Sequence, residues 1–125
     1  NNVSRGKYFR IPLLFFGEVI KEEYRGKSIQ TMGAQNDIAA TLLQQMKVPT
    51  QDFPWSKNLL NPSSSSFAFH GMIRGYGWIK PYGNYSYNFD LKNFIDRNFE
   101  ENTLPKERKQ AEAYFSALFE YYQGL

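Results

Sequence analysis

The stretch Phe67–Phe89, FAFHGMIRGYGWIKPYGNYSYNF, decides the fold class of this chain. Large side chains alternate along it with small or polar ones, which is the period of a strand with one buried face. Glycines interrupt the pattern, and Tyr82-Gly83-Asn84 has the composition of a tight turn. We therefore expect an antiparallel meander of three strands, at Phe67–Ile73, Tyr76–Lys80 and Asn84–Phe89.

Downstream of this meander, the clearest helix pattern in the chain runs from Thr103 to Gly124. Thr103 and Pro105 are typical of a helix start, and Gly124 of a helix end. The apolar residues between them recur at helical spacing, namely Ala111, Tyr114, Phe115, Leu118, Phe119 and Tyr122. This helix must dock on a hydrophobic surface. Before it, residues 91–102 predict a short helical turn, with Leu91, Phe94, Ile95 and Phe99 pointing inward.

Upstream of the meander, Ile11–Phe16, IPLLFF, is a continuous apolar run that ends at Gly17. It is too short for a helix and has no polar alternation, so it predicts a strand covered on both faces. Such a strand needs neighbouring strands on both edges. The chain offers too few further strand candidates to complete a parallel sheet by itself.

The next pattern, Met32–Pro49 or MGAQNDIAATLLQQMKVP, predicts a helix that starts near Asp37 and ends before Pro49. Asp37 is either an acid with a chemical role or a helix cap. A short acceptor side chain before the first apolar residue complements the free N–H groups and the positive end of the helix dipole, which favours the cap. The predicted core stripe of this helix is Ile38, Leu42, Leu43 and Met46.

Composition limits the function classes. The 125 residues are 42% hydrophobic and 18% aromatic, which predicts a folded chain. The net charge of +3 comes from basic residues spread along the sequence, so we expect no nucleic-acid binding. There is no Cys, hence no disulfide and no thiolate site. The chain starts at Asn1 without an initiator Met, which suggests a piece of a longer protein.

Few residues in the sequence are candidates for a catalytic or metal-binding role. His70 is the single His and has no second ligand at metal-binding spacing, so we expect a structural role for it. The adjacent acids Glu22-Glu23 and Glu100-Glu101 point apart on any regular backbone and are expected to be solvated. Ser63–Ser66 lacks the G-x-S-x-G elbow of a serine nucleophile. No catalytic and no metal-binding residue is therefore predicted.

The aromatic density of the predicted strands offers one binding hypothesis. Rings on the exposed face of a sheet stack on sugars, which would make the chain a stand-alone glycan-binding module. The opposing interpretation, which we favour, is that alternate rings form the buried face of the sheet. The rings in question are Phe67, Phe69, Tyr76, Trp78, Tyr82, Tyr85, Tyr87 and Phe89.

Several motifs in this order resemble one known family. KYFRIPLLFFGEVIKEEYRGKSIQTMGAQNDIAATLLQQMKVP, residues 7–49, contains a y-x-x-I-P-L-L strand and, after a loop, D-I-x-x-T-L-L. It resembles the C-terminal portion of sulfatase-like enzymes of the alkaline phosphatase superfamily, closest to the lipoteichoic acid synthase (phosphoglycerol transferase) branch. DFPWSKNLLNP, GYGWIKPYG and EAYFSALFEYY resemble later segments of that branch. The family usually has Pro at the position of Ala40, which a first helical turn tolerates.

The resemblance implies an α/β fold, the C-terminal portion of an alkaline-phosphatase-like fold. One buried strand and a helix would be followed by a small antiparallel meander and a C-terminal amphipathic helix. The chain would be a single piece of a catalytic domain. Its segments would be a strand-loop-helix part at 1–62, antiparallel strands at 63–90 and a C-terminal helical part at 91–125.

The resemblance implies an active site whose catalytic residues lie outside this chain. Family members bind a divalent metal, Mn, Mg or Ca, and use a Thr, Ser or modified Cys nucleophile. The nucleophile, the metal ligands and the family's Asp-His pair would all lie outside this chain, so the piece alone is expected to be inactive. The Asp of the D-I-x-x-T-L-L helix is structural in the family, in agreement with Asp37 as a cap. Lys7, Tyr8 and Arg10 would lie nearest the absent metal ligands.

The implied parent is a metal-dependent sulfatase or phosphoglycerol transferase acting on sulfate or phosphate esters. It would be membrane-anchored and extracytoplasmic, in the periplasm or on the outer face of a bacterial membrane. The expected partners of this chain are the rest of the catalytic domain and, for the parent, a cell-envelope lipid or a sulfated glycan as substrate. In the isolated piece, self-association is a further way to cover the IPLLFF strand.

Overall fold

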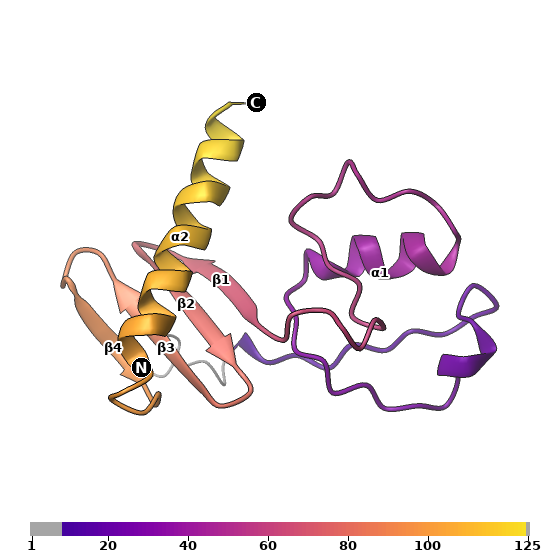
Figure 1. The fold of residues 1–125 in the computed structure, drawn as a ribbon, viewed down its shortest axis with the longest axis horizontal. Coiled ribbons are helices and arrows are strands. Elements are labelled where there is room, and N and C mark those ends of the chain that lie inside the picture. Colours follow the sequence, from indigo (N-terminus) through magenta and orange to yellow (C-terminus); the bar gives the residue numbers. More distant parts are fainter. Residues whose placement is uncertain (1–8, 125) are drawn as a thin grey trace. The chain divides into compact units, whose positions relative to one another are not determined.

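The computed structural model describes residues 9–124, which form two compact units. Arg10–Ala68 make up the N-terminal unit, and residues 69–124 together with Phe9 make up the sheet unit. The elements follow one another along the chain as drawn in Figure 1. The N-terminal unit holds a 3-10 turn, η2 (Glu22–Tyr24), and a helix, α1 (Asp37–Gln45).

The sheet unit is an antiparallel meander of four strands with a helix across one face (Figure 1). The strands lie in the order β1-β2-β3-β4, and the helix α2 follows them. The three predicted strands are confirmed, with bounds that differ by at most one residue at each end. The bounds are Ala68–Met72 for β1, Gly75–Lys80 for β2, Gly83–Asn88 for β3, Asn93–Arg97 for β4 and Leu104–Gln123 for α2.

The core of the sheet unit lies between the sheet and α2. In the register of β2 and β3, Tyr76 pairs with Tyr87 and Trp78 with Tyr85, so four rings share one face. The helix brings Tyr114 and Phe115 onto this face, with ring centroids 5.9 Å from Trp78 and 5.6 Å from Tyr76 respectively. The predicted amphipathic helix therefore docks on an aromatic surface of the sheet.

Strand β4 corrects the prediction of a short helical turn in residues 91–102. Lys92 has a left-handed φ of 49° and turns the chain back beside β3. Phe94 then packs edge-on against Tyr85 and Tyr87 of β3, with centroids 5.1 and 5.5 Å away. Cross-strand aromatic contacts stabilise this strand, and a short apolar pattern does not distinguish a strand from a helical turn.

The predicted buried strand at Ile11–Phe16 is wrong for this structure. Residues 11–16 have no regular secondary structure, and the side chains of Leu14 and Phe16 are 81% and 88% exposed. A strand is stabilised by ladder hydrogen bonds to a neighbour. Within the described N-terminal unit no such neighbour lies alongside, so the apolar run remains an exposed, extended segment.

The face of α1 that is most buried in this structure differs from the predicted core stripe. The buried residues of this helix are Asp37, Ala40, Thr41 and Gln45, which share the opposite face. Of the predicted stripe, Ile38, Leu42 and Leu43 are half-buried, and Met46 lies just past the helix end with 48% exposure. The helix thus turns its polar face inward, and the reason is a set of hydrogen bonds to the loop that follows it.

Candidate functional site

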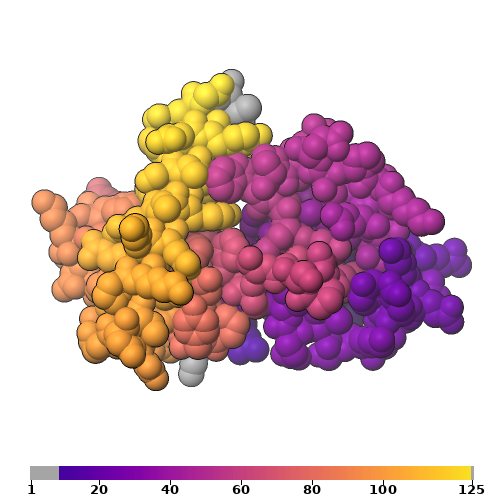
Figure 2. Space-filling model, in the orientation of Figure 1, coloured from indigo at the N-terminus to yellow at the C-terminus, as the bar shows by residue number. Residues whose placement is uncertain are grey.

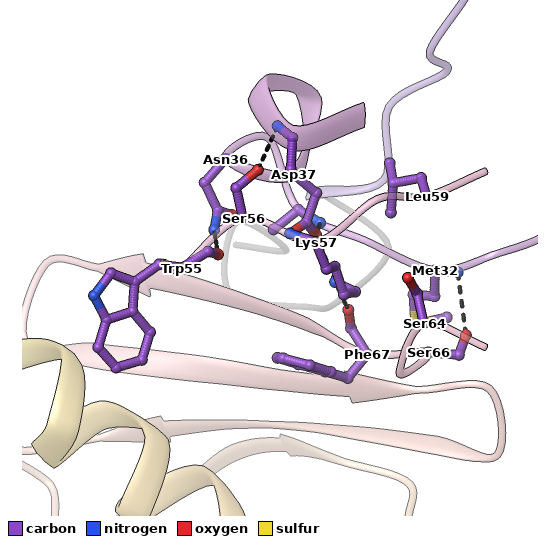
Figure 3. Close-up of polar contacts among 12 residues, drawn as sticks. Met32, Asn36, Asp37, Trp55, Ser56, Lys57, Leu59, Ser64, Ser66 and Phe67 are labelled. Atoms are coloured by element: carbon purple, nitrogen blue, oxygen red, sulfur yellow. Dashed lines mark hydrogen bonds and ion pairs between the residues drawn. The ribbon is translucent and has the colours of Figure 1, made fainter. Parts of the chain in front are cut away.

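Asp37 lies at the centre of a polar cluster in the N-terminal unit (Figure 3). Its side chain is buried, with 2% exposure, at the first residue of α1. Oδ2 accepts a hydrogen bond from the N–H of Ala34 at 2.8 Å, and Oδ1 accepts one from the N–H of Lys57 at 3.0 Å. The carboxylate therefore ties the chain before α1 to the loop after it.

The ammonium of Lys57 completes this cluster. Its Nζ lies 2.5 Å from Oδ2 of Asp37 and donates a further hydrogen bond to the carbonyl of Phe67 at 3.0 Å. The same nitrogen stands 4.4 Å from the centroid of the Phe67 ring, a cation–π distance. Because the side chains of Asp37 and Lys57 are 3% and 18% exposed, water screens the attraction between their charges only weakly.

The helix face around Asp37 makes further bonds to the same loop. The hydroxyl of Thr41 donates to the carbonyl of Asp37 at 2.7 Å and accepts from the N–H of Leu59 at 2.9 Å. The N–H of Ala40 donates to Oγ of Ser56 at 2.8 Å, and the side-chain amide of Asn36 donates to the carbonyl of Trp55 (Figure 3). The bond to Ser56 gives the N–H of Ala40, in the first turn of α1, an acceptor on the loop that follows the helix.

Gly33 lets this cluster form. A Cβ at this position would overlap Oδ2 of Asp37 and the side chain of Leu59. The Gly in MGAQND is therefore explained by close packing, since any larger residue would push the carboxylate away from the N–H of Ala34.

The sequence predicted the start of the helix at Asp37 but not the bonds that Asp37 makes. Its carboxylate bonds Ala34 and Lys57 rather than N–H groups of the first helical turn. Asn36 occupies the N-cap position and makes no side-chain cap bond. Lys57 and Thr41 are contributors that sequence reasoning missed. For Thr41 the available signal was its spacing from Asp37, because residues four apart lie on one helix face.

Chemically, this cluster is an anchor. Both carboxylate oxygens accept hydrogen bonds from the protein, and Oδ2 also contacts an ammonium. Within residues 9–124, no group of three or more His, Asp or Glu side chains is arranged to hold a metal ion. The arrangement fixes a helix to the loop that follows it.

The other acidic and serine candidates occupy structural or exposed positions. Glu22 and Glu23 lie exposed in η2, and Glu101 forms an exposed ion pair with Arg97 at 2.7 Å. Ser64 donates to the carbonyl of Asn58, and Ser66 accepts from the N–H of Met32 at 3.1 Å (Figure 3). The serine run thus serves to hold loops. Arg10 is exposed, and Lys7 and Tyr8 lie outside the described residues.

Most rings of the aromatic meander are unavailable to a ligand. Tyr76, Trp78 and Tyr85 are at most 3% exposed under α2. Tyr82 and Phe89 are the members of the predicted set with large exposed area among the described residues, at 59% and 42%. The interpretation of alternate rings as a buried face is therefore confirmed for the centre of the sheet, and the glycan hypothesis retains only rings near the turns.

A second buried carboxylate, Glu107 in the first turns of α2, was not anticipated from the sequence. It is 2% exposed, and its oxygens accept hydrogen bonds from Nε1 of Trp78 at 2.9 Å and the hydroxyl of Tyr82 at 2.7 Å. Burial would raise the pKa of Glu107, but these two hydrogen bonds, with Lys80 and Lys106 nearby, outweigh it and lower the pKa. Glu107 thereby anchors α2 to β2 and to the turn after it.

Comparison of the chain with protein-family models, with characterised proteins and with solved structures gave no match. Among the described helices, none has the length and apolar character needed to cross a membrane.

Proposed function

We propose that this chain is the C-terminal part of a metal-dependent sulfatase or phosphoglycerol transferase, and that it serves there as a structural element. The proposal starts from the resemblance of its I-P-L-L and D-I-x-x-T-L-L motifs to that family. The divalent metal, the nucleophile and the chemistry on a sulfate or phosphate ester would belong to the rest of the parent domain. This part of the chain would hold that domain together.

Exposed apolar surface in the N-terminal unit is the observation that carries the proposal. Ile11, Leu13, Leu14 and Phe16 are between 47% and 88% exposed in one short extended segment, and the apolar face of α1 is only half-buried. Large apolar side chains exposed close together along the chain favour a surface that another polypeptide covers. An extended IPLLFF segment would enter a parent sheet as a strand, with the apolar face of α1 packed on that sheet.

The polar residues of the D-I-x-x-T-L-L motif also hold α1 to the loop that follows it. Asp37 and Thr41, two of the polar positions of D-I-x-x-T-L-L, both bond the loop at 57–59, where the sequence reads Lys-Asn-Leu. A motif whose polar residues fix a helix to its following loop supports a framework role for this region. The same framework would present the apolar face of α1 outward, toward the parent sheet.

The gene that encodes this chain gives the first test. We expect the sequence preceding Asn1 to encode an Asp-His pair shortly upstream, a Thr, Ser or Cys nucleophile well before it, and membrane spans before that. Assays with aryl sulfate and aryl phosphate esters plus Mn, Mg or Ca should show turnover for the longer protein and none for residues 1–125 alone. Metal-dependent turnover by residues 1–125 alone would overturn the proposal.

A pair of variants tests the exposed surface directly. Leu14→Asp in the longer protein should lower its melting temperature and soluble yield, because it would bury a charge in the parent sheet. Ile73→Asp is the matched control, since Ile73 is 90% exposed but lies on a turn of the sheet unit. In residues 1–125 alone, both variants should behave as the unsubstituted chain does. Equal tolerance of Leu14→Asp and Ile73→Asp in the longer protein would refute the docking of this segment.

A further inference from the structure

The sheet face opposite α2 carries a row of small and polar side chains. In the register, Gly77 of β2 pairs with Ser86 of β3, and Ser86 pairs with Asp96 of β4. These three residues therefore lie side by side on adjacent strands. They point away from α2, because the rings that α2 covers occupy the alternate positions.

His70 of β1 lies at the end of this row. A Cβ on Gly77 would overlap Cε1, Nδ1 and Nε2 of His70, so the imidazole lies across the backbone of Gly77. The ring of Phe9 stacks on the same imidazole, with centroids 3.8 Å apart and an angle of 28° between the planes. The histidine ring thus stacks on Phe9, and a glycine makes room for it.

The polar atoms of this stack are poorly satisfied. Nδ1 and Nε2 of His70 and Oγ of Ser86 are buried, and the structure gives none of them a hydrogen-bond partner among the residues it describes. A neutral imidazole tolerates such a place far better than an imidazolium, whose charge and two N–H donors both need a partner. Desolvation by burial accordingly lowers the pKa of His70.

We propose that the Phe9–His70–Gly77 stack is a pH-sensitive latch, which holds Phe9 on the sheet while the imidazole is neutral and releases it when the ring is protonated. Protonation makes the buried position unfavourable, so the ring must turn toward water, and this removes the surface on which Phe9 stacks. The latch concerns the sheet unit alone and is independent of the function proposed above.

Few charges face His70 from the elements packed against it. Phe9, Gly77 and Ser86 carry none. Asp96 is the titratable group on this face among the described residues, but it lies on the far edge strand, and its Oδ2 accepts a hydrogen bond from Asn84 at 3.0 Å. Lys80 stands over the ring of Trp78, which belongs to the opposite face. Among the described groups, therefore, no adjacent carboxylate is placed to stabilise the imidazolium in the stacked position.

Proton linkage determines the direction in which pH shifts the latch. The unfolded or released state has the ordinary histidine pKa of 6.5, and the latched state has a lower one. The open state therefore binds more protons, and latching becomes more favourable as the pH rises. The latch should be fully closed above the ordinary pKa and should weaken as the pH falls from 6.5 through the lowered pKa.

Nuclear magnetic resonance on the 125-residue chain tests this, because its single His gives one Hε1 signal. We expect that signal to titrate below pH 6.5. The nuclear Overhauser effect between Hε1 and the Phe9 ring should be present at pH 7.5 and lost at the same midpoint. Gly77→Ala should abolish the effect at pH 7.5 by displacing the imidazole. The matched control is His70→Phe, which keeps a stacking ring without titration, so the Phe9 ring signals should become independent of pH.

Three results would overturn the latch. One is a His70 pKa at or above 6.5, which would mean that cation–π attraction to Phe9 stabilises the charged ring. Another is an Overhauser effect that persists through the titration. The last is a change in the indole N–H signal of Trp78 at the same midpoint, because this would indicate unfolding of the whole sheet unit.

Discussion

At the scale of single residues, Asp37 shows how a helix-start residue becomes an anchor. Its carboxylate accepts hydrogen bonds from Ala34 and Lys57 and lies 2.5 Å from the Lys57 ammonium. A cap contributes about 1 kcal/mol, whereas breaking a buried charged pair leaves one charge uncompensated and costs about 3 kcal/mol or more. The structure therefore raises the expected stability contribution of this residue.

We predict that Asp37→Asn lowers the free energy of unfolding by about 3 kcal/mol, because one carboxylate oxygen becomes an NH₂ facing N–H donors and a half-buried ammonium. Urea unfolding followed by circular dichroism measures this change. A double-mutant cycle with Lys57→Met should give a coupling energy of about 1–3 kcal/mol.

The exposed pair Arg74–Asp90 is the matched control, since its N···O distance of 2.6 Å is nearly the same but its side chains are 70% and 51% exposed. Asp90→Asn should change the unfolding free energy by no more than about 0.5 kcal/mol. Equal effects at Asp37 and Asp90 would show that burial does not determine the strength of these two pairs.

At the scale of elements, α2 is held to the sheet by stacked rings and by Glu107. The carboxylate accepts hydrogen bonds from Trp78 and Tyr82, which belong to β2 and to the turn between β2 and β3. Beyond Phe115 the helix continues with exposed rings, such as Phe119 and Tyr122, and the side chains of its last turns stand at the surface in Figure 2. The first half of α2 thus does most of the packing.

Glu107 gives the anchoring of α2 a pH dependence. Since the pKa of Glu107 in the folded state lies below its usual 4.5, the carboxylate stabilises the fold fully above pH 4.5 and loses this effect as the pH falls through the lowered pKa. We expect Glu107→Gln to reduce the loss of stability on acidification below pH 4.5, as measured by urea unfolding between pH 3 and 6.

Glu112→Gln is the control for this prediction, because Glu112 is 51% exposed and pairs with Arg108 on the surface of α2. Its pH profile should stay close to that of the unsubstituted chain. A steeper acid dependence in Glu107→Gln than in the unsubstituted chain would contradict the lowered pKa.

At the scale of the whole molecule, the two units differ in how they bury apolar side chains. The sheet unit has a continuous core of rings between its strands and α2, which includes Tyr76, Trp78 and Tyr85. The N-terminal unit buries Leu59 and Leu60 but leaves several large apolar side chains exposed. Its internal order rests more on hydrogen bonds between α1 and the following loop.

Hydrogen exchange on the isolated chain should reproduce this difference. Amides of β2 and β3, which pair with each other along their whole length, should exchange slowest, and those of residues 11–16 should exchange close to the rate of an unfolded peptide. Mass spectrometry of peptides at two protein concentrations measures both. Slow exchange of residues 11–16 that depends on concentration would indicate strand pairing between copies instead.

The local sequence pattern was sufficient to predict an element where the element that it packs against lies close in sequence. The three predicted strands are joined by short turns, and their alternation already indicated which side chains share a face. The apolar pattern of residues 104–123 predicted the helix α2, which packs on the sheet that precedes it in sequence. Strand β4 escaped prediction because its apolar residues suit a helical turn equally well, and the contact of Phe94 with β3 decided between them.

The sequence by itself determined that the chain forms a meander and two helices, because turn residues and hydrophobic periods act locally. Tertiary structure alone decided which face of α1 is buried and what Asp37 binds, because those outcomes depend on Lys57 and Ser56, far along the chain. It also decided that IPLLFF is exposed in this chain. A strand exists only through hydrogen bonds to a neighbour, and an apolar run does not show whether that neighbour is present.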